Sequence, residues 1–161
     1  MRGWPAPAVP AVPGAGVKRG AFVTLLACET LRGCIGRVTA DRVLGEVVRD
    51  MTVAAARDDR RFSPVTADEV SDLRIAISVL GELVRIAPPT VDPGRIVIGR
   101  DGLVVRRGRA LGLLLPQVAV EYEWDAAAFL AAACQKAGLA ADAWRDPATE
   151  VLVFEADVFA E

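Results

Sequence analysis

The order of apolar and polar positions along the chain predicts a mixture of strands and helices. Residues 20–28 are apolar at both odd and even positions, which favours a strand buried on both faces. Residues 31–38 follow as a second strand with two interior glycines. Residues 73–80 alternate with a period of two, which is typical of a third strand. Residues 150–154 form a last apolar run of strand length. Between the first two strands, Glu29-Thr30 is expected to form a turn.

Two longer segments have helical spacing instead. Asp41 is a suitable N-cap for a helix that ends near Arg57, because apolar residues follow at intervals of three and four: Leu44, Val47, Val48, Met51 and Ala55. Asp125 is placed to cap a second helix, and Gly138 is placed to end it. Thr66-x-x-Glu69 has the spacing of a capping box and predicts a short helical turn over residues 67–72.

The region between these segments is rich in turn signals. Pro88, Pro89 and Pro93 indicate a loop, and residues 95–107 are expected to form a hairpin with Asp101-Gly102 as its turn. The predicted elements together favour an α+β fold. With 161 residues, the chain has the length of a single domain.

Composition narrows the possible functions. The chain has 19 basic and 21 acidic residues, and this balance disfavours a protein devoted to nucleic acid. It has no histidine, so neither a Ser-His-Asp nor a Cys-His catalytic group can form within one chain. Cys28, Cys34 and Cys134 lack the spacing of a disulfide framework or a metal site, so we expect free thiols in a reducing cytoplasm and no metal or cofactor.

The first 17 residues differ in composition from the rest. Pro, Ala, Gly and Val dominate, and four prolines interrupt every apolar run that could serve as a secretory signal. Residues 1–17 are therefore predicted to form a flexible leader, and residues 18–161 the folded domain.

Several motifs, in order, are similar to those of one known family. They are LRGCIG (residues 31–36), AAARDDRRF (54–62), ISVL (77–80), GRDGL (99–103), LLPQVA (114–119) and CQKAGL (134–139). On these motifs the chain resembles the AMMECR domain family, whose prokaryotic members are also called AmmeMemoRadiSam system protein A. The resemblance implies an α+β domain with a larger and a smaller lobe around a mostly antiparallel sheet. It also implies association with a Memo-type protein and a radical-SAM protein, but no defined reaction.

Cys34, at the centre of the hexapeptide, is the first candidate for chemistry. In an extended strand, Arg32 and Cys34 would point to one face and Ile35 to the core. A nearby guanidinium favours the thiolate, and Gly33 and Gly36 would let backbone N–H groups approach an anion closely. The alternative is that Cys34 is a small packing residue and that the glycines allow close contact with another element.

Other side chains could complete such a site. Glu121 is the candidate carboxylate for proton transfer, although the alternative that it is an exposed or salt-bridged carboxylate is favoured. Arg61, with its neighbours Arg57 and Arg60, could clamp an anion or could simply complement the dipole of the preceding helix. The amide of Gln117 could contact a ligand or satisfy buried backbone groups.

These candidates lead to three hypotheses. In the first, the protein is a binding or accessory module, and a cleft lined by Arg32, Cys34, Arg61 and Gln117 holds a small anionic ligand or a partner peptide. In the second, it is an enzyme with Cys34 as nucleophile, and in the third an RNA-binding scaffold. The absence of histidine, the usual general base near neutral pH, favours the first.

Overall fold

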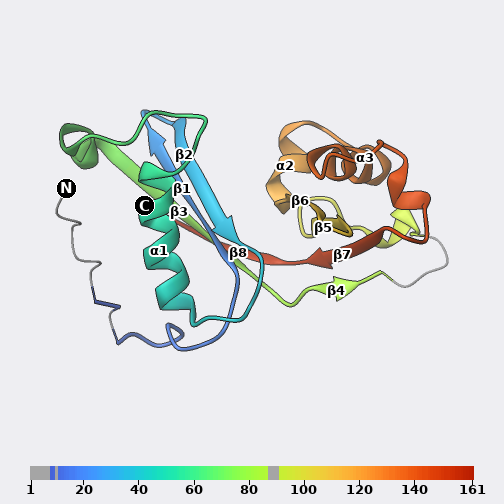
Figure 1. Cartoon of the computed structure of the whole chain (residues 1–161), viewed down its shortest axis with the longest axis horizontal. Coiled ribbons are helices and arrows are strands. Elements are labelled where there is room, and N and C mark those ends of the chain that lie inside the picture. Colours follow the sequence, from blue (N-terminus) through green and yellow to red (C-terminus); the bar gives the residue numbers. More distant parts are fainter. Residues whose placement is uncertain (1–7, 10, 87–90) are drawn as a thin grey trace. The chain divides into compact units, whose positions relative to one another are not determined.

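The fold was analysed in a computed structural model, which describes Ala8, Val9, residues 11–86 and residues 91–161. The chain divides into two compact units (Figure 1). The first contains Met1–Leu80 and Asp157–Glu161, and the second contains Gly81–Ala156. Each unit has its own four-stranded sheet, in the orders β2-β1-β3-β8 and β4-β7-β5-β6. The α+β prediction is confirmed, with the strands divided between two sheets.

The sheet of the first unit is built from β1 (Ala21–Ala27), β2 (Thr30–Arg37), β3 (Leu73–Leu80) and β8 (Ala156–Ala160). Both β2 and β3 pair antiparallel with β1, so β2 lies at one edge. Helix α1 (Leu44–Arg57) packs on β1 and β2 (Figure 1). The core between them contains Val23, Leu25 and Ala55, joined by Ile35 and Met51. The strand β8 was not predicted from the sequence.

The start of α1 differs from the prediction. Its N-cap is Val43, which makes no side-chain capping bond, whereas Asp41 binds Arg37 and Thr39. The leader supplies the missing acceptors: the N–H of Leu44 donates to the carbonyl of Val17 at 2.7 Å, and that of Gly45 to Ala15 at 3.0 Å. Described residues of the leader thus cap the helix. Residues 1–7 and Pro10, which complete the predicted flexible segment, lie outside the described residues.

After α1 the chain returns to the sheet through the 3-10 helix η1 (Ala67–Asp72). The predicted capping box is confirmed, because the carboxylate of Glu69 accepts a hydrogen bond from the backbone N–H of Thr66 at 2.8 Å. The carbonyl of Thr66 in turn accepts a hydrogen bond from the backbone N–H of Glu69 at 3.2 Å.

The second sheet contains β4 (Val84–Arg85), β5 (Gly102–Arg107), β6 (Ala110–Leu114) and β7 (Glu150–Phe154). Helix α3 (Ala126–Lys136) packs against β5 and β6, while α2 (Pro116–Glu121) contacts β5. Two short 3-10 helices, η2 (Pro93–Arg95) and η3 (Ala143–Arg145), contact α3. The predicted N-cap is confirmed, since Asp125 accepts the N–H of Ala128 at 2.8 Å.

The hairpin of this unit is not where the sequence predicted it. Its strands are β5 and β6, and the turn between them contains Gly108 with φ of 60°. Asp101 instead ends the preceding loop with its carboxylate buried, where it accepts the N–H of Val97 and pairs with Arg100. The Asp101-Gly102 dipeptide does not form the predicted hairpin turn. A buried Asp that accepts a hydrogen bond from its own loop gives the same sequence signal.

Candidate functional site

Cys34 lies in the edge strand β2, directly opposite Thr24 of β1. The hydroxyl of Thr24 donates a hydrogen bond to Sγ of Cys34 at 3.3 Å. Since Val23 and Ile35 pack in the core beneath α1, alternation along the strands places Thr24 and Cys34 on the opposite face of the sheet. The thiol is half-buried. It is thus polar in its contacts and partly accessible.

The two glycines of the hexapeptide lie beside other parts of the first unit. A Cβ on Gly33 would lie 2.2 Å from the carbonyl oxygen of Ala55, so this glycine lets β2 pass close to α1. A Cβ on Gly36 would lie 2.2 Å from the ring of Phe22. At both positions, another residue already occupies the space that a side chain would need. The structure thus accounts for them by close contact, and their predicted role toward an anion stays a prediction.

The loop after α1 satisfies the free edge of β2 at Cys34. The backbone N–H of Cys34 donates to Oδ2 of Asp59 at 2.9 Å, and its carbonyl accepts from Nη2 of Arg61 at 3.3 Å. Asp59 and Arg61 are themselves bound through two side-chain contacts, at 2.9 and 2.7 Å. Asp59 thus takes the place of a neighbouring strand's C=O, and Arg61 takes the place of its N–H. Together they cover the edge of β2 at this position.

This pair also fixes the electrostatics beside the thiol. Hydrogen bonds from Arg61 hold the pKa of the Asp59 carboxyl well below its usual range, and bonds from the backbone N–H groups of Cys34 and Arg61 act in the same direction. The same contact raises the pKa of Arg61. Asp59 is therefore an ionised carboxylate with several donors already bound. A carboxylate in this state is a weak base, because general-base catalysis needs a pKa near the operating pH.

Arg32 has a different environment from the one predicted. The pairing shifts register between Leu25 and Leu26, which face Gly33 and Leu31, so Arg32 is the additional residue of a β-bulge. Its guanidinium donates to Glu69 at 2.7 and 3.2 Å and to the carbonyl of Ser63 at 2.9 Å.

The bulge explains this environment, because the side chain of a bulged residue need not follow the alternation of the other side chains along the strand. Hydrogen bonds from Arg32, followed by those from Thr66, lower the pKa of Glu69 to about 2. Arg32 thereby ties η1 to the edge strand, and Arg61 is the arginine that contacts Cys34.

The remaining candidates are divided between the units. Arg32, Gly33, Cys34, Gly36 and Arg61 are gathered in the first unit, whereas Gln117 and Glu121 lie on α2 of the second. Glu121 is exposed and Gln117 is half-buried. The roles predicted for these two residues stay predictions.

Sequence reasoning missed two residues of this cluster, Asp59 and Thr24. The spacing Asp59-x-Arg61 is a signal for a local ion pair. Roles were predicted only for the arginines of residues 57–61, and none for Asp59. The contact between Thr24 and Cys34 depends on the strand register, which a bulge alters. No local motif marks it.

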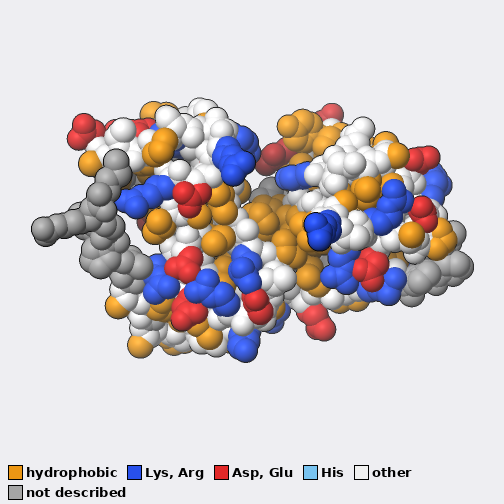
Figure 2. All heavy atoms as spheres, viewed as in Figure 1, with side chains coloured by type: hydrophobic (Ala, Val, Ile, Leu, Met, Phe, Trp, Pro, Cys, Tyr) orange, Lys and Arg blue, Asp and Glu red, His pale blue; other side chains and the backbone are white. Residues whose placement is uncertain are grey.

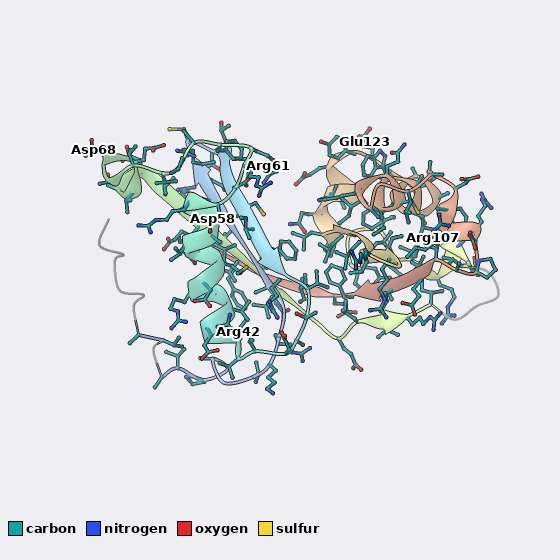
Figure 3. The ribbon with its side chains drawn as sticks, viewed as in Figure 1. Arg42, Asp58, Arg61, Asp68, Arg107 and Glu123 are labelled. Atoms are coloured by element: carbon teal, nitrogen blue, oxygen red, sulfur yellow. The ribbon has the colours of Figure 1, made fainter. Side chains whose placement is uncertain are left out.

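The surroundings of the site carry charges of both signs. Figure 2 shows basic and acidic side chains interspersed on the face drawn, without a continuous basic surface there. In Figure 3, Arg61 lies beside β2, toward the end of α1 at which Asp58 is labelled, while Arg42 lies at the other end of α1. Within the described part of the chain, no group of three or more Cys, Asp or Glu side chains is arranged to hold a metal ion. None of the helices described there combines the length and the apolar character needed to cross a membrane.

Three known proteins are similar to this chain over most of its length. The crystal structure of the uncharacterized protein PH0010 from Pyrococcus horikoshii superposes with a TM-score of 0.90 at 42% identity, covering 96% of this chain and 80% of that chain. Protein TK0174 from Thermococcus kodakarensis is 46% identical over 151 residues, or 89% of this chain and 73% of the relative. Protein Mbar_A1807 from Methanosarcina barkeri is 44% identical over 147 residues, or 91% of this chain and 72% of the relative.

A family-wide comparison extends this likeness to nearly the full length. The model of the AMMECR1 family matches residues 5–159, which includes most of the leader as well as both units. The hexapeptide around Cys34 and all other motifs on which the resemblance was based fall within this range. The chain therefore belongs to the AMMECR1 family.

Proposed function

We propose that the protein is a binding module whose anion-recognising group is the guanidinium of Arg61 beside Cys34. The observation that supports the proposal is that only some of the five N–H donors of this side chain form hydrogen bonds. Nε and Nη2 bind Asp59 and the carbonyl of Cys34, and in the described part of the chain Nη1 makes no hydrogen bond. The side chain is nevertheless 56% exposed. An arginine held in one orientation with one edge free is suited to an incoming carboxylate or phosphate.

Two neighbouring arginines support this interpretation. Arg57 and Arg60 are exposed, and within the described residues neither forms an ion pair. They lie within four residues of Arg61 in the sequence, in a segment whose negative charges are those of Asp58 and Asp59. A small anionic ligand or an anionic group on a partner peptide would find one oriented donor edge with further positive charge close to it in the sequence.

The binding test is an NMR titration of the ¹⁵N-labelled protein with inorganic phosphate. We expect shift changes at the Nε–H of Arg61 and at the amides of Cys34 and Asp59, and a loss of these changes in Arg61→Gln. Arg74→Gln is the matched control, because Arg74 is also exposed and paired with one carboxylate, that of Glu29. Phosphate shifts that persist in Arg61→Gln, or that vanish equally in Arg74→Gln, would contradict the proposal.

The hydrogen bond from Thr24 to Sγ favours a second candidate function, a cysteine-dependent enzyme with Cys34 as nucleophile. Such an enzyme needs a proton acceptor, and Asp59 is saturated with donors, which is why the binding module is preferred. The two can be separated by alkylation with iodoacetamide followed by peptide mapping. Cys28 is exposed and Cys134 is buried, so they serve as fast and slow internal references.

A nucleophilic thiol would be alkylated faster than the freely exposed Cys28. A binding module predicts an intermediate rate for Cys34, and it predicts that Cys34→Ser retains phosphate binding. A rate above that of Cys28, together with loss of binding in Cys34→Ser, would favour the enzyme.

The family also suggests which proteins this module serves. We propose a Memo-type protein and a radical-SAM protein as its partners, on the basis of the family resemblance. The test is size-exclusion chromatography of the purified protein with each purified partner, using wild type, Arg61→Gln and Arg74→Gln. We expect co-elution that Arg61→Gln weakens and Arg74→Gln does not, and the absence of co-elution with either protein would refute this assignment.

A further inference from the structure

The second unit contains an apolar pocket that Cys34 does not line. Its walls are Val91, Pro93, Ala127, Trp144 and Arg145, and its volume is about 390 Å³. This value lies within the range of roughly 300–1,000 Å³ that is common for small-ligand sites. All five residues belong to the second unit.

Arg145 places a cation at this apolar pocket. Its guanidinium carbon lies 4.0 Å from the centroid of the Trp144 ring, in cation-π geometry. Among the described residues no carboxylate pairs with it: the neighbouring Asp146 binds Arg107 at 2.9 Å instead. The guanidinium is thus oriented by an aromatic ring and keeps its N–H donors for another partner.

An adjoining cavity contains an unsatisfied polar group. This second cavity shares Val91 and Trp144 with the first and is also lined by Thr149 and by the oppositely charged Arg85 and Asp146. Its volume is about 10 Å³, close to what one water or one polar ligand atom needs. Thr149 is 6% exposed, and its Oγ1 is the one buried side-chain nitrogen or oxygen of the described residues that lacks a hydrogen-bond partner. A buried hydroxyl without a partner is unfavourable, so a group supplied from the pocket would relieve this cost.

From these observations we infer that the second unit binds a small carboxylic acid with an apolar body. The apolar body lies against Trp144 and Ala127, and the carboxylate receives N–H donors from Arg145. Oγ1 of Thr149 binds a polar atom of the ligand directly or through one water. A carboxylate is the anion that fits best, because a single arginine faces a pocket that is otherwise apolar.

The test uses two probes of nearly the same shape, phenylacetate and its neutral analogue phenylacetamide, in NMR titrations of the full-length protein. We expect phenylacetate to shift the indole N–H of Trp144 and the amides of Val91 and Ala127. Arg145→Gln should weaken phenylacetate by about tenfold, because it removes charge-assisted hydrogen bonds to the carboxylate, and should leave phenylacetamide nearly unchanged. Thr149→Val should weaken both probes by about fivefold, as expected for a neutral hydrogen bond.

Arg109→Gln is the matched control, because Arg109 is exposed in the same unit, lies in the β5–β6 turn and has no ion pair among the described residues. It should leave both affinities unchanged. Failure of phenylacetate to bind at millimolar concentration, shifts centred elsewhere, or equal losses for the acid and the amide in Arg145→Gln would overturn the inference. Unchanged affinities in Thr149→Val would contradict the contact between Oγ1 and the ligand.

Discussion

The backbone N–H of Cys34 donates to the buried carboxylate of Asp59 at 2.9 Å, which joins the centre of the hexapeptide to the loop that follows α1. The two residues are 25 positions apart in sequence. Arg61 completes the contact by binding both Asp59 and the carbonyl of Cys34. The edge strand, the helix and the charged loop thereby form one structural unit around the thiol.

Asp59→Asn should destabilise the protein by about 2 kcal/mol, because it removes the partner charge of Arg61 and weakens the acceptor of a backbone N–H. Urea unfolding would measure the change as a lower midpoint. Asp58→Asn is the control, since Asp58 is exposed and its side chain makes no hydrogen bond among the described residues. Equal midpoints for the two variants would show that the contact to Cys34 contributes little.

The same carboxylate should make stability depend on pH in a defined direction. The folded protein holds the pKa of Asp59 below its usual 3.8, so its stabilising contribution is complete above that value. It is then lost progressively as the pH falls toward the lower pKa of the folded state. The difference in unfolding free energy between wild type and Asp59→Asn should be constant from pH 7 to about pH 5 and should shrink below about pH 4. A difference that grew at lower pH would mean that the sign of the shift is wrong.

Gly33→Ala should destabilise the first unit by about 1–3 kcal/mol, because the new methyl group would lie 2.2 Å from the carbonyl oxygen of Ala55, and backbone cannot move as a side chain can. Thermal unfolding would record the loss. Gly16→Ala is the matched control, since no atom lies within 4 Å of the Cβ that it would carry. If Gly33→Ala unfolded at the wild-type temperature, close packing would not explain this glycine.

Arg32→Gln should loosen η1 locally while changing the overall stability little. The variant removes the bonds to Glu69 and Ser63, but the Glu69 side chain is 36% exposed, and pairs of this kind contribute at most about 1 kcal/mol. Hydrogen exchange should therefore become faster at residues 63–72 and stay unchanged in α1. Arg74→Gln, which breaks an exposed pair elsewhere in the same unit, should not alter exchange at residues 63–72. Equal exchange in the two variants would contradict an anchoring role for Arg32.

The elements with strong local signals were predictable from the sequence. The buried strand around Val23, the alternation of β3, the capping box at Thr66 and the N-cap at Asp125 all follow from contacts between residues near one another in the chain. The predictions failed where distant segments decide the outcome. Asp41 does not cap α1 because leader carbonyls do so, and the Asp101-Gly102 dipeptide is not a hairpin turn because the Asp101 carboxylate is buried in its own loop.

The candidate site divides in the same way. From the sequence alone it follows that a cysteine flanked by glycines lies in a strand and that an arginine-rich loop follows the first helix, and the motifs indicate the family. The contacts of Arg61 with Cys34 and of Arg32 with Glu69 depend on folding, because a one-residue bulge and the return of the chain after α1 set them. The physical reason is range: caps and alternation act over a few residues, whereas register and edge pairing depend on segments brought together only by folding.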